Sequence, residues 1–92
     1  MVKRRYSVTG RVQGVGYRNW TQHRAQEHSL VGWVRNRSDG SVELLVSGDE
    51  TTVSQFEKEL WEGPTYADVK DVTELDLESS ESGEDFQIRS TC

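Results

Sequence analysis

The residues best suited to chemistry lie in one stretch, 8–18, which reads VTGRVQGVGYR. Its first residues predict the end of a strand, Gly14 and Gly16 predict a tight loop, and a helix follows from Asn19. Consecutive backbone N–H groups in such a turn can converge on an anion, aided by the positive end of the helix. Arg18 stands at the junction, where its guanidinium can hold two phosphate oxygens. The stretch predicts a phosphate site, although an ordinary strand–helix turn with a surface arginine has the same pattern.

The two common nucleotide-binding fingerprints are absent from this stretch. No Gly-Lys-Ser/Thr follows the loop, so it is not a Walker A motif. Asn19 stands where a dinucleotide fingerprint has its third glycine. The predicted ligand is therefore a small anion rather than a nucleotide.

The elements around this stretch follow the order βαββαβ, with a possible extra strand at the end. Strands are expected at 5–10, 32–37, 41–47, 67–77 and 86–90, helices at 19–30 and 50–62, and an acidic loop at 78–85. Asp39-Gly40 predicts the hairpin turn between the two central strands. The order is typical of an α+β fold, the ferredoxin-like α/β plait, in which an antiparallel sheet carries two helices on one face.

Three local signals refine these elements. Asn19 is the expected cap of the first helix, and Thr51 or Thr52 of the second, which a Gly-Pro pair ends. The apolar phase slips between Val69 and Val72, which predicts a bulge or turn there.

Length and composition fit a single domain over residues 1–92. The apolar share is 33%, and no run of about 18 apolar residues could span a membrane. The first half carries a balance of +5 and the second half −10, so a chain-wide basic surface for nucleic acid is absent. One cysteine, Cys92, excludes an internal disulfide and favours a cytoplasmic protein, and scattered Cys and His exclude a structural zinc site.

The stretch resembles the first signature of the acylphosphatase family, V-x-G-x-V-Q-G-V-x-F-R. A second block resembles the family's other signature, G-[FYW]-[AV]-[KR]-N-x-x-x-G-x-V-x-x-x-x-x-G. The matching residues are Gly32, Trp33, Val34, Arg35, Asn36, Gly40, Val42 and Gly48. The resemblance covers nearly the whole chain, with two departures: Tyr17 replaces the more usual Phe, and His28 a usual core Leu. The Tyr17 hydroxyl therefore needs a partner.

The resemblance implies hydrolysis of small acyl phosphates to a carboxylate and phosphate, by a monomer without metal, cofactor or covalent phosphoenzyme. Inorganic phosphate is then both product and inhibitor. Arg18 matches the family's phosphate-binding arginine, and Asn36 the asparagine that holds the attacking water. The backbone amides that match the phosphate cradle are those of Gln13, Gly14, Val15, Gly16, Tyr17 and Arg18.

Elementary chemistry agrees with that division of labour. The leaving carboxylate is the base of an acid with a pKa of about 4–5, so it departs without a general acid. A loose transition state spreads charge over the phosphoryl oxygens, which preorganised amides and one arginine can stabilise. Asn36 is a poor base, so its expected role is to position the water rather than to take its proton.

Other candidate residues have simpler explanations. His23 and His28 lie away from both motifs and suit surface or packing roles. Asp39 is explained by its hairpin turn, and Cys92 has no base near it in the sequence. The acidic run 71–85 is expected to be a solvated face rather than a cation site.

Three alternative functions stay open at the level of sequence. The same fold could be a non-catalytic module that binds phosphate or acyl phosphate, although Arg18 and Asn36 together favour an enzyme. An RNA-binding plait stacks bases on sheet aromatics, but its aromatic signature is missing here. A domain of a larger maturation protein is the third alternative, and the start at Met1 counts against it.

Overall fold

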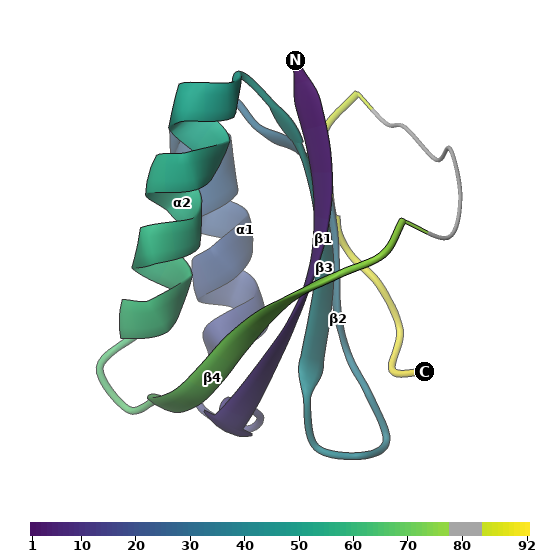
Figure 1. Ribbon diagram of the computed structural model, residues 1–92. Helices are drawn as coiled ribbons and strands as arrows, with labels where there is room; N and C mark the ends of the chain where they lie inside the picture. The colour runs from purple at the N-terminus through teal and green to yellow at the C-terminus, as the bar shows by residue number, and fades with distance from the viewer. Residues whose placement is uncertain (78–83) are drawn as a thin grey trace.

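The computed structural model describes residues 1–77 and 84–92, so most of the predicted acidic loop lies outside the described residues. The elements are β1 (Val2–Arg11), α1 (Tyr17–Glu27), β2 (Val31–Asn36), β3 (Val42–Gly48), α2 (Glu50–Glu62), β4 (Asp68–Leu75) and β5 (Phe86–Ile88). Both helices lie on one face of the sheet (Figure 1). In the described ranges, neither helix is long and apolar enough to cross a membrane. The predicted plait is confirmed.

The five strands have the spatial order β4-β1-β3-β2-β5. The first four are antiparallel to their neighbours, whereas β5 runs parallel to β2. The four strands of the predicted plait are therefore antiparallel, and the possible extra strand at the end of the chain is present as a parallel neighbour of β2. Because β4 and β2 run in opposite directions, a strand that starts at the end where β4 finishes must run parallel to β2.

The bulge expected in the fourth strand is present. Thr9 pairs with Asp71 and Gly10 with Val69, so Lys70 is one residue extra on β4. A single extra residue shifts the side chains of a strand to the opposite faces, which explains the slip in the apolar pattern.

The second helix begins and ends at the predicted residues, whereas the first begins two residues earlier than predicted, and both have other caps than expected. α1 begins at Tyr17, and its cap is Gly16 in the left-handed region (φ 81°) rather than Asn19. Because glycine adopts that conformation without steric cost, the chain turns directly from the loop into the helix. The cap of α2 is Asp49, whose carboxylate accepts from the Thr52 N–H at 3.4 Å, so the threonine caps were also wrong.

The helices pack on the sheet with some polar contacts in place of apolar ones. The buried Tyr17 hydroxyl donates to the Leu60 carbonyl at 2.8 Å, the partner that its replacement of Phe requires. His28 Nε2 lies 2.8 Å from Glu59 Oε2, and the same carboxylate holds Arg24 at 2.6 Å. His28 therefore has the packing role expected of it, at the contact between the two helices.

The chain beyond β4 returns to lie along β2. Asp85 O accepts from the Gly32 N–H at 2.9 Å, and Val34 O accepts from the Arg89 N–H at 2.9 Å. Further along, Asn36 O accepts from the Cys92 N–H at 3.1 Å, and Cys92 O accepts from the Ser38 N–H at 2.9 Å. β2 therefore has hydrogen-bonded neighbours on both sides as far as its last residue.

Candidate active site

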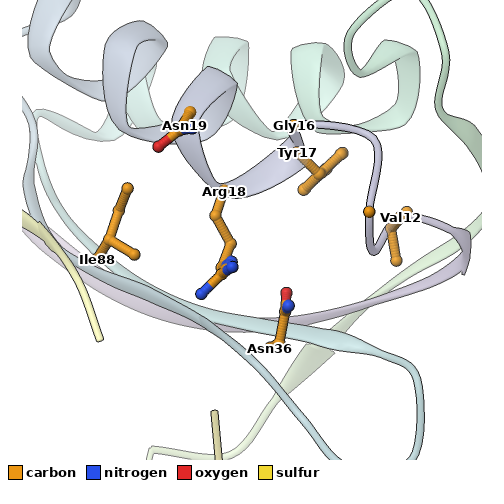
Figure 2. A pocket seen from close by; sticks show the side chains of 8 residues that line it. Val12, Gly16, Tyr17, Arg18, Asn19, Asn36 and Ile88 are labelled. Atoms are coloured by element: carbon orange, nitrogen blue, oxygen red, sulfur yellow. The ribbon is translucent and has the colours of Figure 1, made fainter. Parts of the chain in front are cut away.

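The two predicted site side chains, Arg18 and Asn36, meet at one end of the sheet. β1 and β2 both run antiparallel to β3, so they end on the same side of the molecule. Arg18 is the second residue of α1, which follows β1, and Asn36 is the last residue of β2. A pocket of about 260 Å³ lies between them, lined by Val12, Gly14, Gly16, Tyr17, Arg18, Asn19, Asn36 and Ile88 (Figure 2).

The guanidinium of Arg18 points into this pocket, between Ile88 and Asn36 (Figure 2). Among residues 1–77 and 84–92, no carboxylate forms an ion pair with Arg18. The other ionisable side chain in the lining, Tyr17, has its pKa raised by burial and stays neutral. The pocket is therefore positive at neutral pH, as an anion site requires.

The loop before α1 forms part of the pocket wall. Gly14 and Gly16 both have left-handed φ angles, 74° and 81°, which only glycine adopts readily. Within the described chain, no N–H of residues 13–16 donates to another backbone carbonyl. The first turn of α1 adds N–H groups that a helix leaves without internal partners. Gly14, Gly16 and Tyr17 line the pocket, whereas Gln13 and Val15 are not among its lining residues.

The side chain of Gln13 forms hydrogen bonds away from the pocket. Its side-chain amide Nε2 donates to the Arg37 carbonyl at 2.8 Å and to the Ser41 carbonyl at 2.9 Å. Both amide hydrogens therefore tie the loop to the turn that follows Asn36. Sequence reasoning considered only its backbone, and no local pattern reports partners so distant along the chain.

Asn36 brings an unused acceptor to the pocket. In the described part of the molecule, its side-chain Oδ1 is buried and accepts no hydrogen bond. A buried acceptor without a partner costs about 1–3 kcal/mol, so such atoms are rare in proteins. Its carboxamide faces the same pocket as the Arg18 guanidinium (Figure 2). An oxygen in this position is suited to bind a water molecule beside an anion.

The remaining candidates lie outside the pocket or have partners elsewhere. His23 is exposed on α1, and Cys92 is exposed as well. Asp39 Oδ1 accepts from the Ser41 N–H at 2.9 Å and the Ser41 hydroxyl at 2.6 Å, which confirms its role in the turn. No group of three or more His, Cys, Asp or Glu side chains suited to a metal occurs in the described ranges.

The fold and the pocket define a small α/β-plait protein with a pocket at one end of its sheet that carries an arginine. A family model described as acylphosphatase matches residues 4–88. The acylphosphatase of Rhizobium meliloti is 46% identical over 81 residues, which cover 88% of this chain and 85% of that protein. The chain belongs to the acylphosphatase family.

Solved structures agree with this assignment. The crystal structure of acylphosphatase from Bacillus subtilis superposes with a TM-score of 0.90 at 38% identity, covering 97% of this chain and 99% of that one. An acylphosphatase from Coxiella burnetii superposes with a TM-score of 0.87 at 37% identity, covering 95% and 90%. The resemblance drawn from the two sequence motifs is therefore confirmed over nearly the whole chain.

Proposed function

We propose that this enzyme hydrolyses the carboxyl–phosphate bond of small acyl phosphates, giving a carboxylate and inorganic phosphate. Arg18 and the amides of the loop hold the phosphoryl group, and Asn36 holds the attacking water. The observation that carries this proposal is that, among residues 1–77 and 84–92, neither Asn36 Oδ1 nor the Arg18 guanidinium has a partner, and both lie at the same pocket. The protein acts as a single-domain monomer in the cytoplasm, without a cofactor.

Phosphate binding uses charge and directed donors together. The loop N–H groups and the first turn of α1 point at the bound oxygens, and Arg18 adds a two-pronged cation. These groups are in place before the reaction, so they stabilise the charge that develops on the phosphoryl oxygens without reorganising. Inorganic phosphate carries the same oxygens and should compete with substrate for this site.

The attack needs a water in line with the bond that breaks. Asn36 Oδ1 accepts a hydrogen bond from that water and directs its lone pair to phosphorus. The carboxylate leaves on the opposite side with the electron pair of the P–O bond, and both protons of the water remain on the product phosphate, which forms as H2PO4−. The leaving carboxylate needs no proton at neutral pH, and Tyr17, whose hydroxyl is held by Leu60 O, has no part in supplying one.

Hydrolysis of benzoyl phosphate by the purified protein tests the proposal. Loss of the ultraviolet absorbance of the acyl phosphate should continue through many turnovers per protein molecule. A phosphate-binding module without catalysis would instead bind inorganic phosphate, and the absorbance would fall no faster than in buffer without protein.

The activity should survive removal of divalent metals. Arg18 and the loop amides take the charge-stabilising role that Mg²⁺ has in many phosphoryl-transfer enzymes. Dialysis against a strong chelator, followed by the benzoyl phosphate assay, should leave the rate unchanged. Loss of activity that added Mg²⁺ restores would contradict this mechanism.

A further inference from the structure

The sheet holds a buried carboxylate, Glu43, on the face that the helices do not cover. Along β3, Val42, Leu44 and Val46 point to the helices, so Glu43 points to the opposite face. It is nevertheless only 1% exposed. A carboxylate at such depth needs charged partners to repay its loss of hydration.

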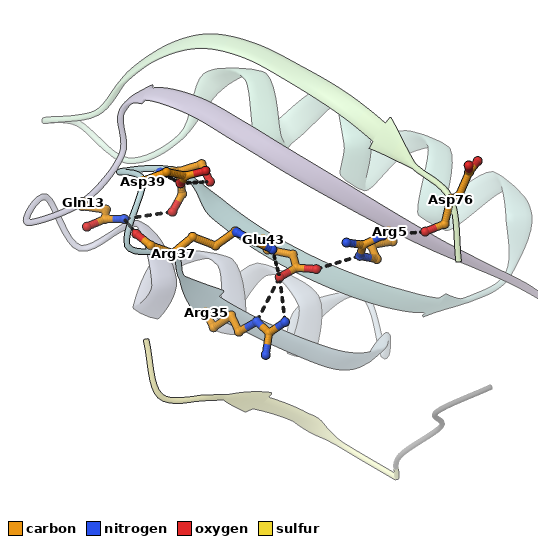
Figure 3. A network of polar contacts seen from close by, with 8 residues as sticks. Arg5, Gln13, Arg35, Arg37, Asp39, Glu43 and Asp76 are labelled. Atoms are coloured by element: carbon orange, nitrogen blue, oxygen red, sulfur yellow. Dashed lines mark hydrogen bonds and ion pairs between the residues drawn. The ribbon is translucent and has the colours of Figure 1, made fainter. Parts of the chain in front are cut away.

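Three arginines from different segments supply those partners (Figure 3). Arg5 Nε on β1 donates to Glu43 Oε2 at 2.7 Å. The other oxygen, Oε1, accepts from Arg35 Nε at 2.9 Å and from Arg37 Nη1 at 3.0 Å. Burial alone would raise the pKa of Glu43, but the Arg5 and Arg35 guanidinium groups hold it below its usual value, so the carboxylate is ionised at neutral pH.

Two of these arginines are the chain neighbours of Asn36. Arg35 precedes it and Arg37 follows it, and the alternation of a strand sends their side chains to the face opposite its own. Glu43 Oε1 therefore binds the side chains of both chain neighbours of Asn36, on the face of the sheet that the helices do not cover. The Arg37 carbonyl also accepts from Gln13, which ties the same point to the phosphate loop.

The side chain of Asn36, unlike those of its two neighbours, has no hydrogen-bond partner among the described residues. Among the described residues, none forms a hydrogen bond with its carboxamide, and Oδ1 is buried without a partner. The direction of the carboxamide must then come from the backbone that carries it. Geometry matters here, since a misplacement of about 1 Å at a reacting group can cost about a hundredfold in rate.

We propose that Glu43 is a positioning residue for hydrolysis: by gripping Arg35 and Arg37, it fixes the direction in which Asn36 presents its carboxamide to the attacking water. The inference rests on the proposed role of Asn36. Glu43 touches neither substrate nor water and acts only through its two arginines.

The test is Glu43→Gln, which keeps the side-chain size and removes the charge. The expected result is a fall in kcat of about tenfold or more, with KM and the inhibition constant of phosphate within about twofold of wild type. Binding should persist because Arg18 and the loop are unchanged.

A matched control separates positioning from general destabilisation. Glu59 is also a largely buried carboxylate that holds two side-chain partners, the Arg24 guanidinium and the His28 imidazole, but it lies between the helices. Glu59→Gln should lower the melting temperature and leave kcat within about twofold when assayed well below that temperature. A Glu43→Gln protein that behaves in the same way would overturn the proposal.

A double variant tests whether Glu43 acts through Asn36. If it does, Glu43→Gln combined with Asn36→Ala should have the kcat of Asn36→Ala alone, because the group being positioned is gone. Losses that multiply instead would overturn the inference. An Asn36→Ala protein with wild-type kcat would refute the proposed function itself, whereas an impaired Asn36→Ala beside a fully active Glu43→Gln refutes only the role of Glu43.

If Glu43→Gln does not fold, a single ion pair of Glu43 can be removed instead. Arg37 is more exposed than Glu43, so Arg37→Met removes one grip on Asn36 at little cost to the core. We expect kcat to fall several-fold without a change in phosphate inhibition, and Arg37→Lys, which keeps the ion pair, to recover most of it. Equal kcat values for the wild type, Arg37→Met and Arg37→Lys would overturn the proposal.

Discussion

Replacing Arg18 by glutamine should lower kcat for benzoyl phosphate at least a hundredfold and leave a folded protein. Among the residues that the structure describes, the guanidinium is the only cationic side chain in the pocket lining and forms no ion pair whose loss would cost stability. Loss of one preorganised partner for transition-state charge costs about 3 kcal/mol or more. Arg18→Lys should recover part of the rate, since a lysine lacks the two-pronged fork.

The same variant should lose its stabilisation by phosphate. At about ten times its Kd, a ligand adds about 1.4 kcal/mol, or several degrees of melting temperature for a domain of this size. Arg11→Gln removes an equal charge from the exposed end of β1 and serves as control; it should keep both rate and shift. Near-wild-type hydrolysis by Arg18→Gln would refute the assignment of the site.

Asn36→Ala should also lose most of its activity, at least about tenfold in kcat, but keep the phosphate shift in melting temperature. Its carboxamide is proposed to hold the water, whereas the phosphate contacts remain. The fold should not weaken, because the substitution removes a buried acceptor that has no hydrogen-bond partner among the described residues.

Asn19→Ala is the matched control for this prediction. Asn19 lines the same pocket and is exposed on the first turn of α1, so its loss should leave hydrolysis within about threefold. If Asn36→Ala loses phosphate stabilisation as fully as Arg18→Gln does, Asn36 is a phosphate ligand and the proposed division of roles is wrong. Thermal melts with and without phosphate decide between these outcomes.

The parts of the fold that sequence predicts are those with local causes. Alternating apolar residues around Asp39-Gly40 identify the hairpin, since a turn and its two flanking strands are neighbours in the chain. The slip between Val69 and Val72 likewise predicts the bulge. An extra residue in a strand that packs on a core shifts the apolar side chains by one position in the sequence. The two motifs are also local, and they predict that Arg18 lies at the start of a helix and Asn36 at the end of a strand.

The features that sequence misses depend on geometry or on distant partners. Asn19 is a good cap by residue type, but Gly16 can take a left-handed φ, and the helix begins there. The grip of Gln13 on Arg37 and Ser41, and the three arginines around Glu43, join segments that only the folded sheet brings together. Glu43 alternates with the core residues of β3, and its burial depends on arginines from other segments.

The segment that returns along β2 bears on how the protein stays separate from other copies of itself. Without it, β2 would be an edge strand, whose open N–H and C=O groups can recruit a strand from another chain. The segment from Asp85 to Cys92 occupies that edge through its bonds to β2 and the turn that follows. The opposite edge, β4, is guarded by charges at Asp68, Lys70, Asp71 and Glu74. Edge-to-edge aggregation through the strand that carries Asn36 would first require this covering segment to detach.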